Sequence, residues 1–125
     1  MENFGDVFKL GSRTQREHAN YKRLFDKHLK IIQTMHRFGV KILAGTDTML
    51  YSIPGFNLHD ELELLVRAGL SPLEALQTAT LNPAEYLNKM DEFGTVEVGK
   101  RADIVLLKEN PLLGIGNTRK IGAVV

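Results

Sequence analysis

The sequence contains no cysteine, and this absence removes several kinds of chemistry at once. Without thiols the chain can form no disulfide, no thiolate metal site and no cysteine nucleophile. Any metal ion must therefore be bound by histidine, aspartate or glutamate side chains.

Long apolar runs and an excess of charge of one sign are also absent. No segment reaches the roughly 18 to 20 consecutive apolar residues of a membrane-spanning helix, and the N-terminus lacks the apolar stretch of a signal peptide. The formal net charge is +1, so no overall field favours nucleic acid or an anionic membrane. We therefore expect a cytoplasmic protein with no nucleic-acid or membrane partner.

The composition, by contrast, is that of an ordinary folded protein. Hydrophobic residues make up 43% and charged residues 25% of the chain, close to the averages for soluble globular domains. A chain of 125 residues is long enough for one domain with its own core. It is too short for a complete eight-stranded α/β barrel, which needs about 200 to 250 residues.

The first half of the chain predicts a long helix followed by a strand. Apolar side chains recur mostly at intervals of three and four residues, which predicts a helix over about 14–38 that Gly39 ends. The short apolar run at about 40–44, before Gly45, predicts a buried strand of a parallel sheet. The apolar face of the helix comprises Tyr21, Leu24, Phe25, Ile31, Ile32, Met35 and Phe38.

The pattern then predicts three shorter helices, followed by short strands. We expect helices at about 58–68, 72–80 and 83–89, preceded by Asn57, Ser71 and Asn82 as capping residues. Ser71, with proline at the first helical position and Glu74 three residues after the cap, is a complete start signal, and Asn82 with Pro83 and Glu85 repeats it. Beyond Phe93 we expect short strands at 95–98, 104–107 and 121–125.

Three segments of the sequence form a characteristic series. They are Ala-Gly-Thr-Asp at 44–47, a stretch at 58–84 that begins Leu-His-Asp-Glu-Leu and ends Asn-Pro-Ala, and Gly-Thr-Val-Glu-Val-Gly-Lys onward at 94–107. Each segment is weak alone, but in this order and spacing they resemble the C-terminal end of the metal-dependent amidohydrolase superfamily. The similarity is greatest to its imidazolonepropionase-like and dipeptidase-like branches.

The resemblance implies an α/β fold that is helix-rich overall and only a fragment of the family's fold. Residues 1–92 would form the C-terminal part of a (β/α)8 barrel, with its last helix, last strand and trailing helices. Residues 93–125 would form part of a small flanking β-sandwich. The family's N-terminal segment, its His-x-His pair, its metal-binding lysine and its two further histidines have no counterpart in this sequence.

The same resemblance assigns a role to Asp47. In the family, the aspartate that ends the eighth barrel strand is a ligand of the active-site metal and transfers protons, and Asp47 matches it. A divalent metal, expected to be zinc, lowers the pKa of a bound water; the aspartate accepts the water's proton and passes it to the leaving nitrogen. Without the resemblance, an aspartate here would more commonly cap a turn through the amides of Thr48 or Met49.

The four histidines differ in what they suggest. His59 follows the loop after Asp47 and resembles a position of the dipeptidase-like members, so one interpretation is substrate binding. The other is a pair with Glu63, four residues further along a helix. We expect His18, His28 and His36 to be packed or edge residues of the long helix rather than metal ligands.

These features predict the C-terminal portion of a metal-dependent hydrolase that acts on C–N bonds of a small cyclic amide or dipeptide-like substrate. The isolated chain is expected to be inactive, because one carboxylate does not make the metal site. The alternative is a non-catalytic truncated paralogue, or an oligomerising interaction module on the same scaffold. Apolar surface that a whole barrel would bury should then be exposed, so we also expect self-association.

Overall fold

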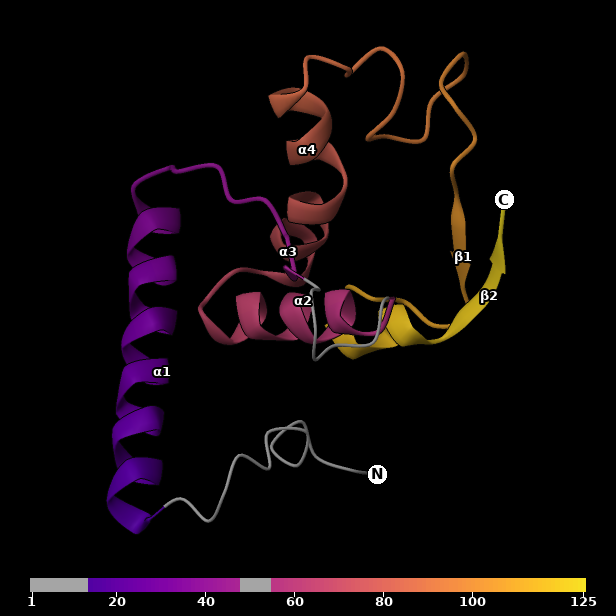
Figure 1. Ribbon diagram of the computed structural model, residues 1–125. Coiled ribbons are helices and arrows are strands. Elements are labelled where there is room, and N and C mark those ends of the chain that lie inside the picture. Colours follow the sequence, from indigo (N-terminus) through magenta and orange to yellow (C-terminus); the bar gives the residue numbers. More distant parts are fainter. Residues whose placement is uncertain (1–13, 48–54) are drawn as a thin grey trace.

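The computed structural model describes residues 14–47 and 55–125, and these form a helix-rich fold with one small sheet (Figure 1). Figure 1 shows the longest helix standing to one side of the others, and the sheet at the opposite side. The elements are α1 (Gln15–Arg37), α2 (Asn57–Arg67), α3 (Pro72–Ala79), α4 (Leu81–Tyr86), β1 (Val105–Leu107), the 3-10 helix η1 (Ile115–Arg119) and β2 (Ile121–Val124).

Helix α1 covers the range predicted for the long helix. It begins at a capping box, in which Thr14 Oγ1 accepts from the Glu17 amide and the Glu17 carboxylate accepts from the Thr14 amide at 2.7 Å. It ends before Gly39, whose φ of +76° is the left-handed conformation that follows many helices. None of the side chains of α1 is buried.

The hydrophobic core surrounds helix α2. Leu62 and Leu65 project from α2 onto Ala75 of α3, Leu70 of the intervening turn and Ile115 of η1, and all five are buried. Helix α3 begins at the predicted capping box, in which Ser71 and Glu74 exchange hydrogen bonds between side chain and backbone. The core therefore joins α2 to segments before and after the sheet strand β1.

The predicted strand at 40–44 is not formed within the described residues. A strand requires a neighbouring strand to bond its backbone, and here helices take that place. The Ala44 amide donates to the Thr78 carbonyl at 3.0 Å. The Asn82 side-chain amide donates to the Ile42 carbonyl at 2.8 Å. This segment is thus anchored to α3 and α4.

Two of the predicted caps are wrong, for local reasons. Phe56 already has helical angles, so α2 begins at Asn57 and the side chain of Asn57 lies inside the first turn rather than capping it. Helix α4 begins at Leu81, which places Asn82 within the helix and frees its side chain for the bond to Ile42.

The C-terminal region contains one antiparallel strand pair. β1 and β2 lie at two of the predicted sites, with Val105 opposite Val124 and a register shift after Leu106. The strand predicted at 95–98 is wrong: the segment forms loop and turn, and Val96 and Val98 are 83% and 107% exposed. Their alternation has no partner strand within the described residues. Within residues 14–47 and 55–125, no helix is long and apolar enough to cross a membrane.

Candidate functional site

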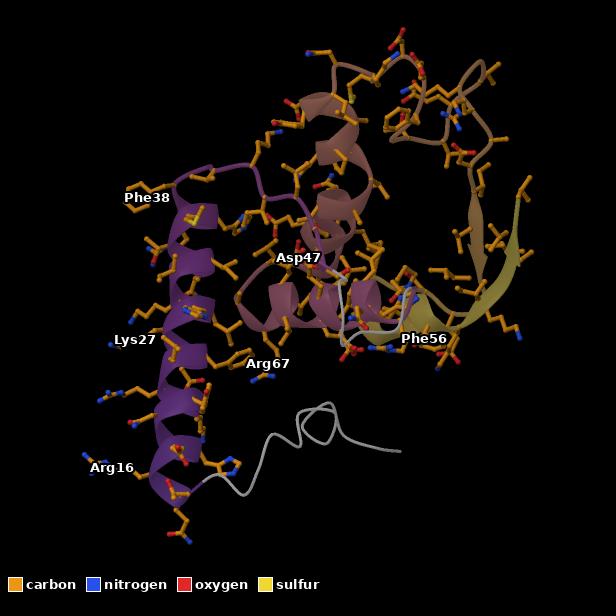
Figure 2. All side chains as sticks on the ribbon, viewed as in Figure 1. Arg16, Lys27, Phe38, Asp47, Phe56 and Arg67 are labelled. Atoms are coloured by element: carbon orange, nitrogen blue, oxygen red, sulfur yellow. The ribbon has the colours of Figure 1, made fainter. Side chains whose placement is uncertain are left out.

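Asp47 lies in the segment between α1 and α2, where it is the last residue described before 48–54 (Figure 2). It is exposed. Its φ is +42°, a left-handed backbone conformation that few residues other than glycine adopt. Aspartate tolerates this conformation better than most side chains, and such residues are concentrated at functional sites. Thr48 and Met49, the alternative partners expected for its carboxylate, lie outside the described residues.

Glu61 holds the backbone immediately before Asp47, and the sequence interpretation missed this residue. The Gly45 amide donates to Glu61 Oε1 at 2.9 Å. The other oxygen, Oε2, is buried and has no hydrogen-bond partner within the part of the chain that the structure describes. A signal was available, because Glu61 precedes the buried Leu65 by four residues and so shares its helix face.

A groove of about 330 Å³ lies between α1 and α2, beside Gly45 and Thr46. Its walls are mainly apolar, with Phe25 and Ile32 on α1, whereas Gly45, Thr46 and Glu61 contribute polar atoms. Two of the long-helix histidines have edge positions of the kind predicted. His28 lines this groove, and His36 Nε2 lies 3.3 Å from Glu74 Oε1.

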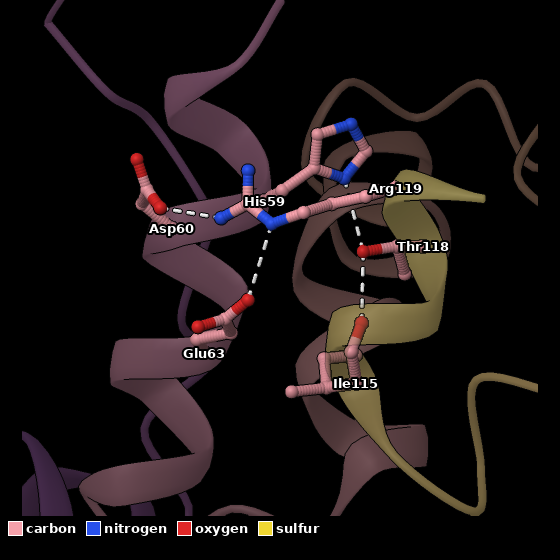
Figure 3. Close-up of polar contacts among 6 residues, drawn as sticks. All are labelled: His59, Asp60, Glu63, Ile115, Thr118 and Arg119. Carbon is pink, nitrogen blue, oxygen red and sulfur yellow. Dashed lines mark hydrogen bonds and ion pairs between the residues drawn. The ribbon is translucent and has the colours of Figure 1, made fainter. Parts of the chain in front are cut away.

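His59 is bound to the C-terminal part of the chain (Figure 3). Its Nδ1 lies 2.9 Å from Thr118 Oγ1. Thr118 Oγ1 lies 2.8 Å from the carbonyl oxygen of Ile115. Two oxygen atoms at this distance repel each other unless a hydrogen lies between them, so the Thr118 hydroxyl donates to this carbonyl. Nδ1 of His59 is therefore the donor in its bond to Thr118. In neutral His59 the lone pair is consequently on Nε2.

Charged neighbours act on His59 in opposite directions. Burial lowers the pKa of His59 below its usual value and the Arg119 guanidinium lowers it further, whereas Asp60 and Glu63 raise it. The net shift is downward, so His59 is neutral at pH 7. Arg119 pairs with Asp60 and, at 3.3 Å, with Glu63 (Figure 3). Within the described residues Glu63 is paired with Arg119, and no ion pair between Glu63 and His59 is formed.

The structure brings the Asp47 turn to Glu61 but gives Asp47 and His59 different neighbours. His59 faces η1, and Glu61, two residues further along the helix, faces Gly45. Residues two apart in a helix point in different directions. No group of three or more histidine, aspartate or glutamate side chains within residues 14–47 and 55–125 is arranged to hold a metal ion. These residues alone do not fit a metal site.

Known proteins are similar to this chain in sequence and in structure. Ochratoxinase of Aspergillus niger is 40% identical over 96 residues, which are 75% of this chain and 19% of that protein. Imidazolonepropionase of Fusobacterium nucleatum subsp. nucleatum is 31% identical over 81 residues, 64% of this chain and 20% of that protein. A crystal structure of a Xaa-Pro dipeptidase with bound methionine in the active site matches with a TM-score of 0.71 and 31% identity, over 78% of this chain and 23% of that one.

The chain thus spans about a fifth of the length of the curated relatives it matches. The profile of the amidohydrolase family matches residues 18–125, which include every helix and strand after the first turn of α1. The chain belongs to the amidohydrolase family.

Proposed function

We propose that this chain is the C-terminal portion of a metal-dependent hydrolase that cleaves C–N bonds in small cyclic amides or dipeptide-like substrates. Family membership supports hydrolysis of C–N bonds, and the names imidazolonepropionase and Xaa-Pro dipeptidase among similar proteins support these two substrate classes. The observation that carries the proposal is Asp47, whose exposed carboxylate sits on a residue with an uncommon backbone conformation.

The proposal assigns one chemical task to this chain. Asp47 accepts the proton of the attacking water and later donates it to the leaving nitrogen. Amidohydrolases generally use a divalent metal, and we propose zinc with Asp47 as one ligand. The described residues do not supply the other ligands, so these must come from elsewhere in a whole enzyme. His59 is proposed to contact substrate, and Nε2 is the ring atom available for this contact.

A barrel of the family's kind would explain why this chain exposes so many apolar side chains. We propose that residues 1–92 are the last part of such a barrel and residues 93–125 part of a flanking β-sandwich. The exposed apolar side chains of α1 support this proposal, because a barrel helix packs that face against its neighbours. The two-stranded sheet supports it too, since a lone strand pair is seldom stable without further strands or a packed helix.

The experiment compares the native gene product that contains this sequence with the 125-residue chain. Both are incubated with Xaa-Pro dipeptides and small cyclic amides, with and without a chelator, and free amine or carboxylate is measured. We expect chelator-sensitive turnover by the native product, restored by zinc, and none by the 125-residue chain. A native product inert toward every C–N substrate contradicts the function; chelator-sensitive turnover by the 125-residue chain contradicts its proposed inactivity.

One observation favours a second candidate, an oligomerising interaction module on this scaffold. Tyr21, Ile31 and Phe38, on α1 and at its C-cap, are 54%, 55% and 84% exposed, and apolar patches of this kind mark protein contacts. Light scattering of the 125-residue chain tests it. Self-association that Ile31→Glu abolishes would support the module, and a strict monomer at micromolar concentration would count against it.

A further inference from the structure

We propose that Glu61 is a positioning residue of this site: its carboxylate holds the turn at 45–47 and so sets the direction of the Asp47 carboxylate. The inference rests on the proposed function, because it assigns Glu61 to the catalytic task of Asp47. It adds a residue from a different element, since Asp47 follows the segment after α1 whereas Glu61 belongs to α2.

The backbone before Asp47 is held at successive points, and Glu61 makes one of these contacts. The Ile42 carbonyl accepts from Asn82 and the Ala44 amide donates to α3. The Gly45 amide then donates to Glu61 at 2.9 Å. Only Thr46 separates this bond from Asp47. A left-handed aspartate persists when its surroundings determine its conformation, and this bond constrains the backbone two residues before Asp47.

The energetics of Glu61 indicate that stability is not the reason for its place. Its Oε2 is buried without a hydrogen-bond partner within the described residues, and a buried unpaired acceptor lowers stability. Gly45 is exposed, so water can replace Glu61 as the partner of its amide. A side chain that breaks the usual rule of paired buried polar groups calls for an explanation, and a functional role is one such explanation.

Glu61→Met in the native gene product separates positioning from stability. Methionine has a similar length and no carboxylate, so the unpaired acceptor disappears while the packing volume stays nearly the same. We expect kcat to fall by about 100-fold, because a small misplacement of a catalytic group has an effect of this size. KM should stay the same, and the melting temperature should stay the same or rise.

Two further variants control this experiment. Glu109→Met removes an exposed carboxylate that pairs with Lys120 at 2.6 Å beside the sheet, and it should change neither kcat nor the contacts of Gly45. Glu61→Gln keeps a side-chain carbonyl that can accept from the Gly45 amide. It should therefore retain most of the kcat that Glu61→Met loses.

A readout independent of activity is the hydrogen exchange of the Gly45 amide, measured by NMR in the 125-residue chain. The amide should be protected in the wild type and in Glu61→Gln. In Glu61→Met it should exchange as fast as an amide bonded to water. Equal exchange rates in wild type and Glu61→Met would overturn the inference whatever the enzyme does.

The outcomes separate this inference from the proposed function. If the native product cleaves no C–N substrate, the function fails, and the exchange of Gly45 still decides whether Glu61 holds the turn. If the product is active and Glu61→Met keeps its kcat, only the inference fails. A melting temperature that falls together with kcat would make Glu61 a structural residue and would also overturn it.

Discussion

Helices α1 and α2 have similar amphipathic patterns but very different surroundings. α1 has 23 residues and buries none of its side chains. α2 has 11 residues and buries Leu62 and Leu65. The difference lies in what each apolar face meets, because α3 and η1 pack on α2 more extensively than α1 does. Figure 1 shows α1 standing to one side of these helices. A periodic pattern therefore indicates a helix and its face, but not whether a partner covers that face.

The contact between the two helices is correspondingly slight. The Arg67 guanidinium lies 5.4 Å from the centre of the Phe25 ring, an attractive cation–π arrangement. Gln33 lies against Gly69, where an added Cβ would be 2.9 Å from the Gln33 side-chain nitrogen. These contacts orient α1 without burying it. We therefore expect the stability of the chain to reside in the α2–α3–η1 core.

Truncating one side chain in each region tests this comparison with the largest expected effect. Leu65→Ala should lower the free energy of unfolding by about 2–5 kcal/mol, because it leaves a cavity in the core. Ile31→Ala on α1, where Ile31 is 55% exposed, should change it by at most about 0.5 kcal/mol. Denaturant titration measures both, and equal losses would remove the distinction between the two helices.

Gly94, which follows α4, is packed closely against that helix. Gly94 has a φ of +99°, and an added Cβ would lie 2.6 Å from the Ala84 Cβ and 3.3 Å from the Thr80 carbonyl oxygen. Gly99 has a similar φ of +93° and open space around it. Gly99→Ala should destabilise by about 1–2 kcal/mol from backbone strain alone. Gly94→Ala should exceed it by about 1–3 kcal/mol from overpacking.

The matching capping boxes of α1 and α3 allow a finer comparison. Ser71→Ala should lower the global free energy of unfolding by about 1 kcal/mol, the usual effect of losing a helix cap. Thr14→Ala removes the equivalent cap from α1. It should reduce helix content, seen by circular dichroism, and leave the denaturation midpoint unchanged. A midpoint shift as large as that of Ser71→Ala would show that α1 unfolds together with the core.

The smallest expected effect concerns pH and the contact of α2 with η1. Burial and Arg119 lower the pKa of folded His59, whereas the unfolded value is about 6.5. Below about pH 6.5 the unfolded chain therefore binds more protons, so stability falls as pH falls toward the folded pKa. His59→Asn should weaken this dependence, and denaturation midpoints across this range measure it. An unchanged dependence would contradict the shift.

Local patterns were enough to predict the helices and two of the strands. Periodic apolar residues and the Ser71–Glu74 capping box each specify structure within a few residues of themselves. The strands predicted at 40–44 and 95–98 are not formed within the described residues, because a strand depends on a neighbour that can lie anywhere along the chain. An apolar run predicts that a segment is buried, but not which element it packs against. Within the described residues, the run at 40–44 is bonded to helices rather than to a neighbouring strand.

The candidate site also has features that the sequence indicates and features that depend on distant contacts. Asp47 was singled out by resemblance, since its exposed carboxylate has no local pattern of its own. Glu61 was missed although its helix face signalled burial, because sequence does not show which backbone amide it meets. The partner of His59, Thr118, lies 59 residues away. Such a contact follows from how α2 packs on η1, which depends on the whole core.

The kcat of the native gene product carrying Asp47→Asn, beside Asp26→Asn, tests the central claim most directly. The claim is that this chain contributes the proton-transferring carboxylate of a C–N hydrolase. Asp26 is an exposed aspartate of α1 outside the site, and its replacement should leave kcat unchanged. Asp47→Asn should lower kcat by about 10²–10⁴-fold, the usual contribution of a general acid–base group. A kcat that Asp47→Asn leaves at the level of Asp26→Asn would contradict the claim.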